Sequence, residues 1–533
     1  MAWAVCVVEK WREDPFYGAV AVVKAEGYVV GDFTGGIHGA FRDYVELPPG
    51  VYTVGGEECA IEPLSYPWHF SVPYMAARWG DVVELRIYAT EELEVPGGFV
   101  AKLADVGPFS VYLAATRGAS YVVKCCGRSR RFKAPHPGEA PRLSALYEVL
   151  PDRAGPGRGC RDLSKQFCGG TLKDVAELAA GAVDFADGLY LHPIYPAMSY
   201  HRYDVVNHFD VDERVGGWAA FYALKEALSK VGMGLVLDLV LYHVAPRSPL
   251  FPDGPFVIKS AEGARLVKKL VEILPREALR GVFSGEPPYE TFLKVWLMPR
   301  LDYTRREAVE YARRVVEFWA PHVDGFRLDV AHGIPPEAWR AALEPARGRY
   351  VFGEHVGNPA PFYHVIRGFT AYFLYHHGVK RLGEGVEEVA RGVNRYLALT
   401  PPSAVPHMNL FLENHDLDRA ASFLSPDAVV MGYALIYSLP GVPSVYMGGE
   451  CGEVGRAEDH TNRRPFPGCG GHPLKSFLAK LFAARKRLGL SAGPAYAYTR
   501  RGRLVLWRGD VEVEVERGRA VFTSPGGSLE IFI

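Results

Sequence analysis

The stretch Val323-Asp324-Gly325-Phe326-Arg327-Leu328-Asp329-Val330-Ala331-His332-Gly333 reads as a short buried strand that ends on a carboxylate. Side chains of a strand alternate between its two faces, so Arg327 and Asp329 point to the same side. A charge at the end of an apolar run must be solvated, paired or functional. Two interpretations stay open for this pair: a structural ion pair at a strand end, and a catalytic carboxylate held beside a fixed cation.

The segments around this stretch alternate between short apolar strands and helices from about residue 141 onward. Strands are expected at Ala145–Leu150, Gly188–His192, Gly234–Val240, Gly325–Asp329, Tyr350–Glu354, Phe369–Leu374, Asn409–Glu413 and Pro443–Met447. Helices are expected between them, at Leu172–Ala182, Gly217–Val231, Thr304–Ala320, Pro336–Pro345, Gly385–Tyr396, Asp427–Leu439 and Pro473–Leu488. Eight such units predict a (β/α)8 TIM barrel, an α/β fold.

The remaining segments define the expected domains. The connection between the third and fourth strands, about residues 244–303, is too long for an ordinary loop and predicts an inserted loop subdomain in the barrel. Residues 1–140 alternate short β-branched and aromatic runs with Gly/Pro turns, which predicts an N-terminal β-sandwich. The catalytic barrel is expected over residues 141–488, and a small C-terminal β-domain over residues 489–533.

Composition excludes several classes of protein. The net charge is −1 and the pI is about 7.0, so nothing indicates a nucleic-acid partner. The apolar N-terminal run is too short for a signal peptide, and no apolar run of about 18 residues predicts a membrane span. We therefore expect a cytoplasmic protein. Gln occurs only at Gln166 and there are 40 prolines, a pattern typical of thermostable proteins.

The eight cysteines show no zinc-binding spacing. Cys160 with Cys168, and Cys451 with Cys469, are close enough in sequence to form loop disulfides, which intracellular proteins of hyperthermophiles can carry. Buried free thiols are an equal alternative for each pair.

The predicted strand ends bring charged residues together, because catalytic groups of a (β/α)8 barrel lie at the C-terminal ends of its strands. The fourth strand ends in Asp329, the fifth in Glu354, and the seventh runs into Glu413-Asn414-His415-Asp416. The third strand leads through residues 238–243, which add Asp238 and His243. This convergence favours a functional site over a structural ion pair.

Several carboxylates without a nucleophilic Cys or Ser motif, and without a phosphate-binding glycine loop, are typical of glycoside chemistry. One carboxylate attacks the anomeric carbon, and a second protonates the leaving oxygen and later activates water.

The order of the motifs resembles that of the α-amylase family of glycoside hydrolases, over about residues 144–488. The matching segments are Ala145–Arg153, Ser199–Asp204, Asp238–His243, Gly325–Asp329, Gly353–Glu354, Asn414–Asp416 and Gly441–Glu450.

The resemblance implies a role for each matched residue. Asp329 would be the nucleophile, Glu354 the general acid/base, and Asp416 would hold sugar hydroxyls and favour the distorted ring. Arg327 would orient Asp329 and keep it ionised. The other substrate-binding residues that the resemblance implies are Tyr203, Asp204, Asp238, His243, His415 and Arg419. His332 and His355, at positions where relatives differ, are also predicted to bind the substrate.

Within the family, Met298-Pro299-Arg300-Leu301-Asp302 resembles a motif of the neopullulanase, cyclomaltodextrinase and maltogenic amylase group. This implies α-glucan oligosaccharides or cyclodextrins as binding partners. Members of this group carry an N-terminal β-domain that often forms a homodimer and covers the partner's active site. A homodimer through residues 1–140 is therefore expected by analogy.

Some positions depart from the family pattern. Tyr242 stands where relatives often have a calcium-binding Asn, and the loop after Pro151-Asp152-Arg153 lacks an Asn/Asp cluster, so no metal or cofactor is predicted. His332-Gly333 stand where close relatives tend to have Asn-Glu, which leaves the balance of hydrolysis and transfer open. The residue at the position of His355 varies with specificity.

Three hypotheses follow. The first is a retaining hydrolase that cleaves α-1,4 linkages of maltodextrins or cyclodextrins by double displacement, with or without transglycosylation. The second is a 4-α-glucanotransferase or trehalose-forming enzyme on the same scaffold. The third is a non-catalytic carbohydrate-binding barrel, which the intact set of Asp329, Glu354 and Asp416 disfavours.

Overall fold

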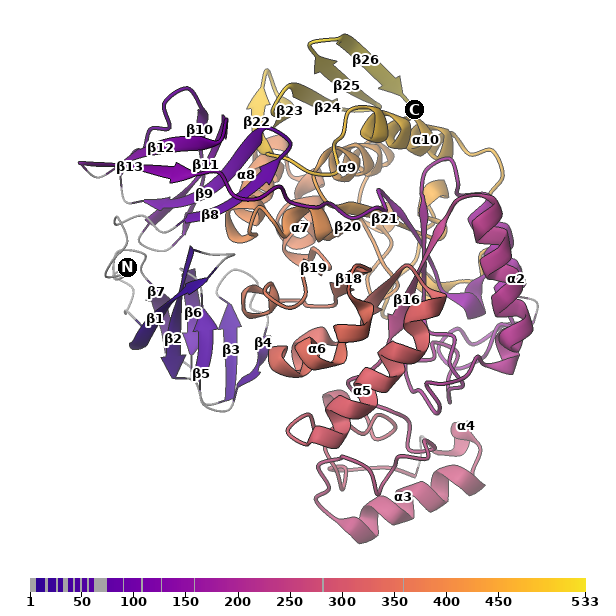
Figure 1. Cartoon of the computed structure of the whole chain (residues 1–533). Coiled ribbons are helices and arrows are strands. Elements are labelled where there is room, and N and C mark those ends of the chain that lie inside the picture. The colour runs from indigo at the N-terminus through magenta and orange to yellow at the C-terminus, as the bar shows by residue number, and fades with distance from the viewer. Residues whose placement is uncertain are drawn as a thin grey trace.

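Figure 1 shows the computed structural model of the chain. The structure describes residues 6–14, 18–24, 27–31, 37–41, 44–47, 50–54, 57–61, 74–89, 91–106, 109–125, 127–157, 159–279, 282–357 and 359–533. Among these residues, no helix combines the length and the apolar character that a membrane span requires.

A parallel sheet of eight strands forms the centre of the molecule, in the order β19-β18-β17-β16-β15-β14-β21-β20. A parallel bridge between Thr370 and Asn409 joins the two ends of this order and closes the sheet into a barrel. The strands are buried on both faces, which explains why they read as continuous apolar runs. They are β14 (Leu146–Val149), β15 (Gly188–Leu191), β16 (Gly234–Leu239), β17 (Gly325–Leu328), β18 (Tyr350–Gly353), β19 (Gly368–Phe369), β20 (Asn409–Phe411) and β21 (Val442–Tyr446).

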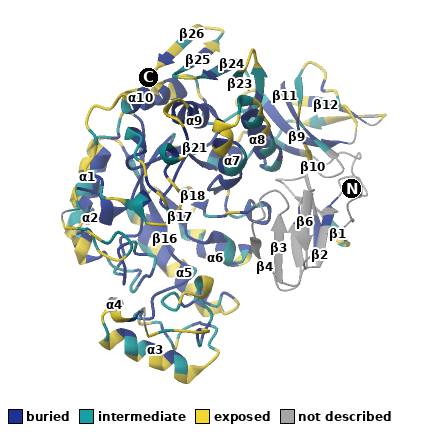
Figure 2. Cartoon of the chain, turned by 180° about the vertical axis from the view of Figure 1, so that it is seen from behind, coloured by how far each residue is buried: buried dark blue, intermediate teal, exposed yellow. Residues whose placement is uncertain are grey.

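Helices follow the strands and cover the outside of the barrel, where their outer faces carry the exposed residues (Figure 2). They are α1 (Leu172–Ala180), α2 (Gly217–Lys230), α5 (Arg306–Trp319), α6 (Pro336–Ala342), α7 (Tyr372–His377), α8 (Val386–Leu399), α9 (Pro426–Ser438) and α10 (Pro473–Arg487). Side-chain caps fix several starts: Thr171 and Asp174 form a capping box at α1, and Ser425 caps α9. The predicted (β/α)8 fold is confirmed.

The predicted sixth strand is wrong over most of its length. A strand is expected over Phe369–Leu374, but β19 covers only Gly368 and Phe369, Thr370 adds a single bridge to Asn409, and α7 begins at Tyr372. The run is apolar and aromatic throughout, so it is buried either as a strand or as a helix, and periodicity does not separate the two.

The insertion after β16 carries α3 (Ala261–Ile273) and α4 (Arg276–Leu279), which project away from the barrel (Figure 1). Antiparallel bridges tie its base together, among them Phe256 with Leu301 and His243 with Arg300. The second bridge links the insertion to the segment that follows β16, so the subdomain borders the mouth of the barrel.

The N-terminal region forms two groups of antiparallel strands. The first group is β1 (Val8–Asp14), β2 (Gly18–Lys24), β3 (Gly27–Gly31), β4 (Ile37–Phe41), β5 (Tyr44–Leu47), β6 (Gly50–Val54) and β7 (Glu57–Ile61). The second is β8 (Tyr74–Trp79), β9 (Val82–Ala89), β10 (Phe99–Val106), β11 (Phe109–Arg117), β12 (Ser120–Cys125) and β13 (Arg128–Lys133). The region is thus all-β as predicted, and each group contains two antiparallel sheets.

The second group is fastened to the barrel by a buried charge. Arg86 on β9 pairs with Glu84 at 2.7 Å and donates to the carbonyl of Leu397 in α8 at 2.7 Å. The first group reaches the barrel at another point, where β4 lies beside residues 331–333. The domain limits at residues 140 and 488 stay predictions.

The C-terminal region is an antiparallel meander in sequence order, as predicted. Its strands are β22 (Tyr496–Arg500), β23 (Arg503–Arg508), β24 (Val511–Glu516), β25 (Arg519–Ser524) and β26 (Gly527–Phe532). Helix α9 packs against β24 and β25 as well as the barrel, so it is buried from Ala428 to Ser438.

The structure pairs the cysteines that the sequence left open. Cys160 is bonded to Cys168, with Cα atoms 5.0 Å apart, and Cys451 to Cys469, with Cα atoms 6.3 Å apart. A further disulfide joins Cys6 and Cys59 in the first N-terminal group. The Cys6–Cys59 disulfide was not predicted, because 53 residues separate the two cysteines in sequence.

Candidate active site

The predicted carboxylates meet at one mouth of the barrel. Asp329 follows β17 and Glu354 follows β18, while Asp238 on β16 lies beside Arg327 in the parallel register. Because the three strands are adjacent, their C-terminal ends bring these side chains to one point. Asp416, in the loop after β20, has its own partners, His415 and Arg463.

One buried guanidinium joins three of the carboxylates. Arg327 Nη1 lies 2.8 Å from Asp329 Oδ1 and 3.0 Å from both oxygens of Asp238, and Nη2 lies 2.9 Å from Glu354 Oε1. The side chains of Arg327, Asp329 and Glu354 are 2%, 8% and 13% exposed. The two carboxyl groups at the centre of the site therefore share one cation.

Burial raises the pKa of Asp329 well above its usual value, with Arg327 acting against this and Glu354 and Asp238 adding to it. The sequence reasoning expected Arg327 to keep Asp329 ionised. Its charge does act in that direction, but desolvation and the two like charges outweigh it. Asp329 therefore retains a proton more readily than an isolated carboxyl group.

The backbone after Asp329 is held in an unusual conformation. Val330 has φ 46° and ψ 45°, a left-handed geometry that is rare for a β-branched residue. Its amide donates to Glu354 Oε2 at 3.0 Å. The strained residue thus orients the carboxyl group opposite Asp329, and such strain is typical of functional sites.

The hydroxyl of Tyr203 is a second meeting point. It donates to Asp238 Oδ2 at 2.8 Å and lies 3.0 Å from His415 Nε2 and 2.9 Å from His192 Nδ1. The Tyr203 ring lies parallel to that of His415, with centroids 5.6 Å apart. These contacts fix the ring at the mouth, and its predicted stacking on a sugar stays a prediction.

Asp416 is held by two cations and remains accessible. His415 Nε2 lies 3.1 Å from Asp416 Oδ2, and Arg463 Nη2 lies 2.7 Å from Oδ1. Burial alone would raise the pKa of Asp416, but His415, Arg463 and Arg327 outweigh it and hold the pKa well below its usual range. The side chain is 39% exposed, so solvent screens part of this attraction.

Other predicted residues support the site from below the surface. His243 is buried, contacts the carbonyl of Tyr203 through Nε2 at 3.0 Å, and stacks on the Phe292 ring of the insertion. Asp204 is also buried, and Oδ1 accepts from the amide and hydroxyl of Ser199 at 2.9 and 2.6 Å. Both residues shape the loop that carries Tyr203.

Arg419 does not join the carboxylate group. It is buried, donates to Glu413 Oε1 at 2.8 Å and lies over the Tyr446 ring at 4.0 Å. Arg419 therefore contacts other buried side chains and none of the three predicted catalytic carboxylates. His332 and His355 lie near Glu354, and the centroids of the two imidazole rings are 5.3 Å apart.

Sequence reasoning missed three residues that contact the predicted set. Glu148 on β14 and His192 after β15 contact His415 and Tyr203, and Arg463 binds Asp416. The first two could have been found by reading the ends of all eight strands, because both stand at strand ends. Arg463 lies in an irregular segment after β21, where no pattern in the sequence marks it.

Two clusters of side chains among the described residues carry the donor types of a metal site. One is Glu450 with Cys451 and Cys469, but those two sulfurs are bonded to each other. The other is Glu148, His192 and His415. These three side chains belong to the wall of the site, where they contact Tyr203 and Asp416.

Comparison with known proteins shows which enzymes this chain resembles. The model of the α-amylase catalytic domain matches residues 185–260. A cyclomaltodextrinase from a Bacillus species is 26% identical over 342 residues, covering 58% of this chain and 59% of that protein. Neopullulanase 2 from Thermoactinomyces vulgaris is 26% identical over 369 residues, covering 63% of this chain and 60% of that protein.

The solved structure of a maltogenic amylase from S. marinus shares the whole architecture. Its TM-score is 0.77 at 18% identity, and the alignment covers 98% of this chain and 99% of that one. The matched part spans about three fifths of the length of the curated relatives. The chain is thus similar to the α-amylase family of glycoside hydrolases, and its relatives include cyclomaltodextrinases, neopullulanases and maltogenic amylases.

Proposed function

We propose that this protein is a retaining α-glucan hydrolase that cleaves α-1,4 linkages of maltodextrins or cyclodextrins by double displacement. The observation that carries the proposal is the pairing of Asp329 and Glu354 through one buried guanidinium at the barrel mouth. The substrate class follows from relatives that are named for cyclomaltodextrin and maltose chemistry.

In the first step, Asp329 attacks the anomeric carbon while Glu354 donates its proton to the departing glycosidic oxygen. The bond to the leaving sugar breaks and a covalent ester to Asp329 forms. Arg327 stabilises the negative charge that then remains on Glu354. Asp416, held ionised by His415 and Arg463, accepts hydrogen bonds from sugar hydroxyls.

In the second step, Glu354 takes a proton from water, and the resulting hydroxide equivalent displaces Asp329 from the anomeric carbon. Each displacement inverts the configuration, so two displacements retain it. If the hydroxyl of a second sugar replaces the water, the product is a transglycosylated glucan. The balance of these outcomes depends on the acceptor side near His332 and Gly333.

Turnover of maltotriose and of cyclodextrin by three variants tests the proposal. Asp329→Asn removes the nucleophile and should abolish turnover, and Glu354→Gln should lower kcat by roughly 10²–10⁴-fold. Asp418→Asn is the matched control, since this exposed carboxyl lies in the same loop as Asp416 and accepts from the amide of Ala457. It should keep the parent rate.

The products separate the alternatives. Reducing sugar that accumulates with the α-configuration supports hydrolysis with retention, and longer chains from a maltooligosaccharide support the glucanotransferase. Binding of glucan without turnover in the parent protein would support the non-catalytic barrel. Unchanged turnover in Asp329→Asn would overturn the catalytic assignment.

Two further proposals concern the whole protein. The cytoplasmic location is proposed from the composition of the chain, and the homodimer through residues 1–140 from the family resemblance alone. Light scattering on the purified full chain measures the oligomeric state directly.

A further inference from the structure

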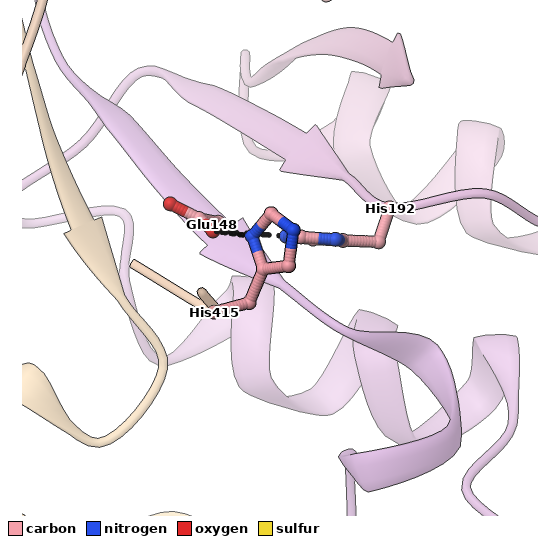
Figure 3. A group of neighbouring side chains, drawn as sticks. All are labelled: Glu148, His192 and His415. Carbon is pink, nitrogen blue, oxygen red and sulfur yellow. Dashed lines mark hydrogen bonds and ion pairs between the residues drawn. The ribbon is translucent and has the colours of Figure 1, made fainter. Parts of the chain in front are cut away.

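Four side chains in the wall of the site lie within hydrogen-bonding distance of one another in a closed ring. Glu148 Oε1 lies 2.9 Å from His192 Nε2 and 3.1 Å from His415 Nδ1, as the dashed lines in Figure 3 mark. The Tyr203 hydroxyl closes the ring, at 2.9 Å from His192 Nδ1 and 3.0 Å from His415 Nε2. The two imidazole rings meet edge to face, with centroids 4.1 Å apart.

The ring determines where its protons are. An ionised carboxylate accepts hydrogen bonds and donates none, so His192 Nε2 and His415 Nδ1 must each carry a hydrogen. His415 then meets a second carboxylate, because its Nε2 lies 3.1 Å from Asp416 Oδ2. With a carboxylate on each side, the imidazole satisfies both contacts when both nitrogens carry hydrogens, which makes it a cation.

The same three side chains also offer the donor set of a zinc site, two histidines and a glutamate. However, both imidazole nitrogens face the same oxygen, Glu148 Oε1, at hydrogen-bonding distance. Hydrogen bonds to that one oxygen satisfy both nitrogens without an ion. The arrangement is therefore complete with protons, and it favours a hydrogen-bonded network over a metal centre.

We propose, resting on the function proposed above, that Glu148 and His192 are positioning residues that hold His415 as an imidazolium directed at Asp416. Neither residue reaches the sugar itself. Glu148 fixes the charge and orientation of His415 from behind, and His192 fixes Glu148 from the other side. Asp416 is thereby kept ionised for the hydroxyls of the substrate.

The electrostatics of the surroundings agree with this arrangement. Burial acts to lower the pKa of His415, but Asp416 and Glu148 outweigh it and raise that pKa to about 9. Burial acts to raise the pKa of Glu148, but the two histidines outweigh it and lower it to about 2. Burial and the charge of His415 lower the pKa of His192 to about 4, so His192 is neutral.

The other groups that face this ring also carry charges. Arg463 Nε donates to the His415 carbonyl at 2.6 Å, and Asp238 receives the Tyr203 hydroxyl. Arg327 lies 5.8 Å from the centroid of the Tyr203 ring. Of these, the two arginines oppose the charge on His415, so a nearby anion such as Glu148 is needed to stabilise it.

Histidine-labelled protein tests the proposal by NMR, with the His415 signal identified by its absence in His415→Gln. In the parent protein, both His415 nitrogens should carry protons at pH 7. Glu148→Gln keeps the shape and removes the charge, and it should lower the His415 titration midpoint by about one to three pH units. His192→Asn removes a neutral ring, so it should leave that midpoint within about half a unit while lowering kcat roughly tenfold through lost orientation.

Kinetics supply the second measurement. Glu148→Gln should lose more activity at pH 8 than at pH 5, relative to the parent, because His415 is still protonated at the lower pH. A His415 midpoint that does not move in Glu148→Gln would overturn the proposal. So would a stoichiometric metal ion in the purified parent protein that is lost in His192→Asn.

The NMR measurement needs no substrate and is made on the parent protein as well as on the variants. If Asp329→Asn stays active, the proposed function fails while the protonation of His415 can still be read. If Glu148→Gln does not fold, a neutral His415 in the parent at pH 7 still overturns the proposal.

Discussion

Replacing Arg327 by Met tests whether one guanidinium holds the carboxylates of the site together. The side chain is 2% exposed and contacts Asp238, Asp329 and Glu354 at 2.8–3.0 Å. Methionine keeps much of the volume but leaves these carboxylates buried without their cation. Removing one partner of a buried ion pair costs about 3–5 kcal/mol. At about 2 °C per kcal/mol for a large domain, the unfolding midpoint should fall by about 6–10 °C.

The loss of stability should depend on pH in a defined direction. The pKa of Asp329 is already raised in the folded protein, so its protonated form contributes stability that is present at low pH and is lost as pH rises through the folded pKa. Without Arg327 this pKa rises further. Each additional proton bound by the folded variant changes the free energy of unfolding by about 1.4 kcal/mol per pH unit. The variant should therefore be much closer to the parent at pH 5 than at pH 8.

Arg485 provides a matched control. It is also fully buried, but its guanidinium donates to the backbone carbonyls of Ser144, Tyr437, Leu439 and Gly441 rather than to carboxylates. Burial lowers the pKa of Arg485 to about 10, so it is charged at both pH values. Arg485→Met should lower the unfolding midpoint by a similar amount at pH 5 and pH 8.

Thermal unfolding at one scan rate, at pH 5 and pH 8, measures both variants. The same midpoint change at both pH values for Arg327→Met would refute the reasoning. In the turnover assay, Arg327→Met should lose about 10–1,000-fold in kcat/KM near neutral pH, since an adjacent cation shifts a carboxyl pKa by about one to three units. Arg485→Met should keep its turnover at temperatures where it is folded.

Two further substitutions test residues that the structure brought to light. Arg463→Gln should lower kcat/KM by about 10–100-fold by removing a charge-assisted bond to Asp416, while Arg463→Lys should recover part of it, because a single ammonium replaces the planar contact to Asp416 and the His415 carbonyl. An unchanged rate in Arg463→Gln would remove this residue from the site. Gly333→Ala places a Cβ against the Tyr242 ring, 2.6 Å from Cδ2, and should cost about 1–3 kcal/mol. Adding Tyr242→Ala should recover most of the lost unfolding midpoint, and a failure to do so would refute the contact.

The barrel could be predicted from the sequence because its strands are short, apolar and buried on both faces, and because helices separate them regularly. Asp329, Glu354 and Asp416 could be predicted as site residues because the C-terminal ends of all strands of a parallel barrel lie at one mouth. The sixth strand was misjudged, since a buried aromatic run satisfies a strand and a helix equally well. The N-terminal strands were recognised, but their division into two groups depends on long-range pairing that local patterns do not carry.

The sequence alone therefore determined the fold class and the central carboxylates, since both follow from local periodicity and from the geometry of one barrel. Tertiary structure decided which charges meet. Arg327 is shared by three carboxylates, His415 lies between Glu148 and Asp416, and Arg463 reaches Asp416 from a segment with no regular structure. These contacts join residues far apart in the chain, and the protonation of each group depends on burial and on its neighbours in space, which the order of residues does not specify.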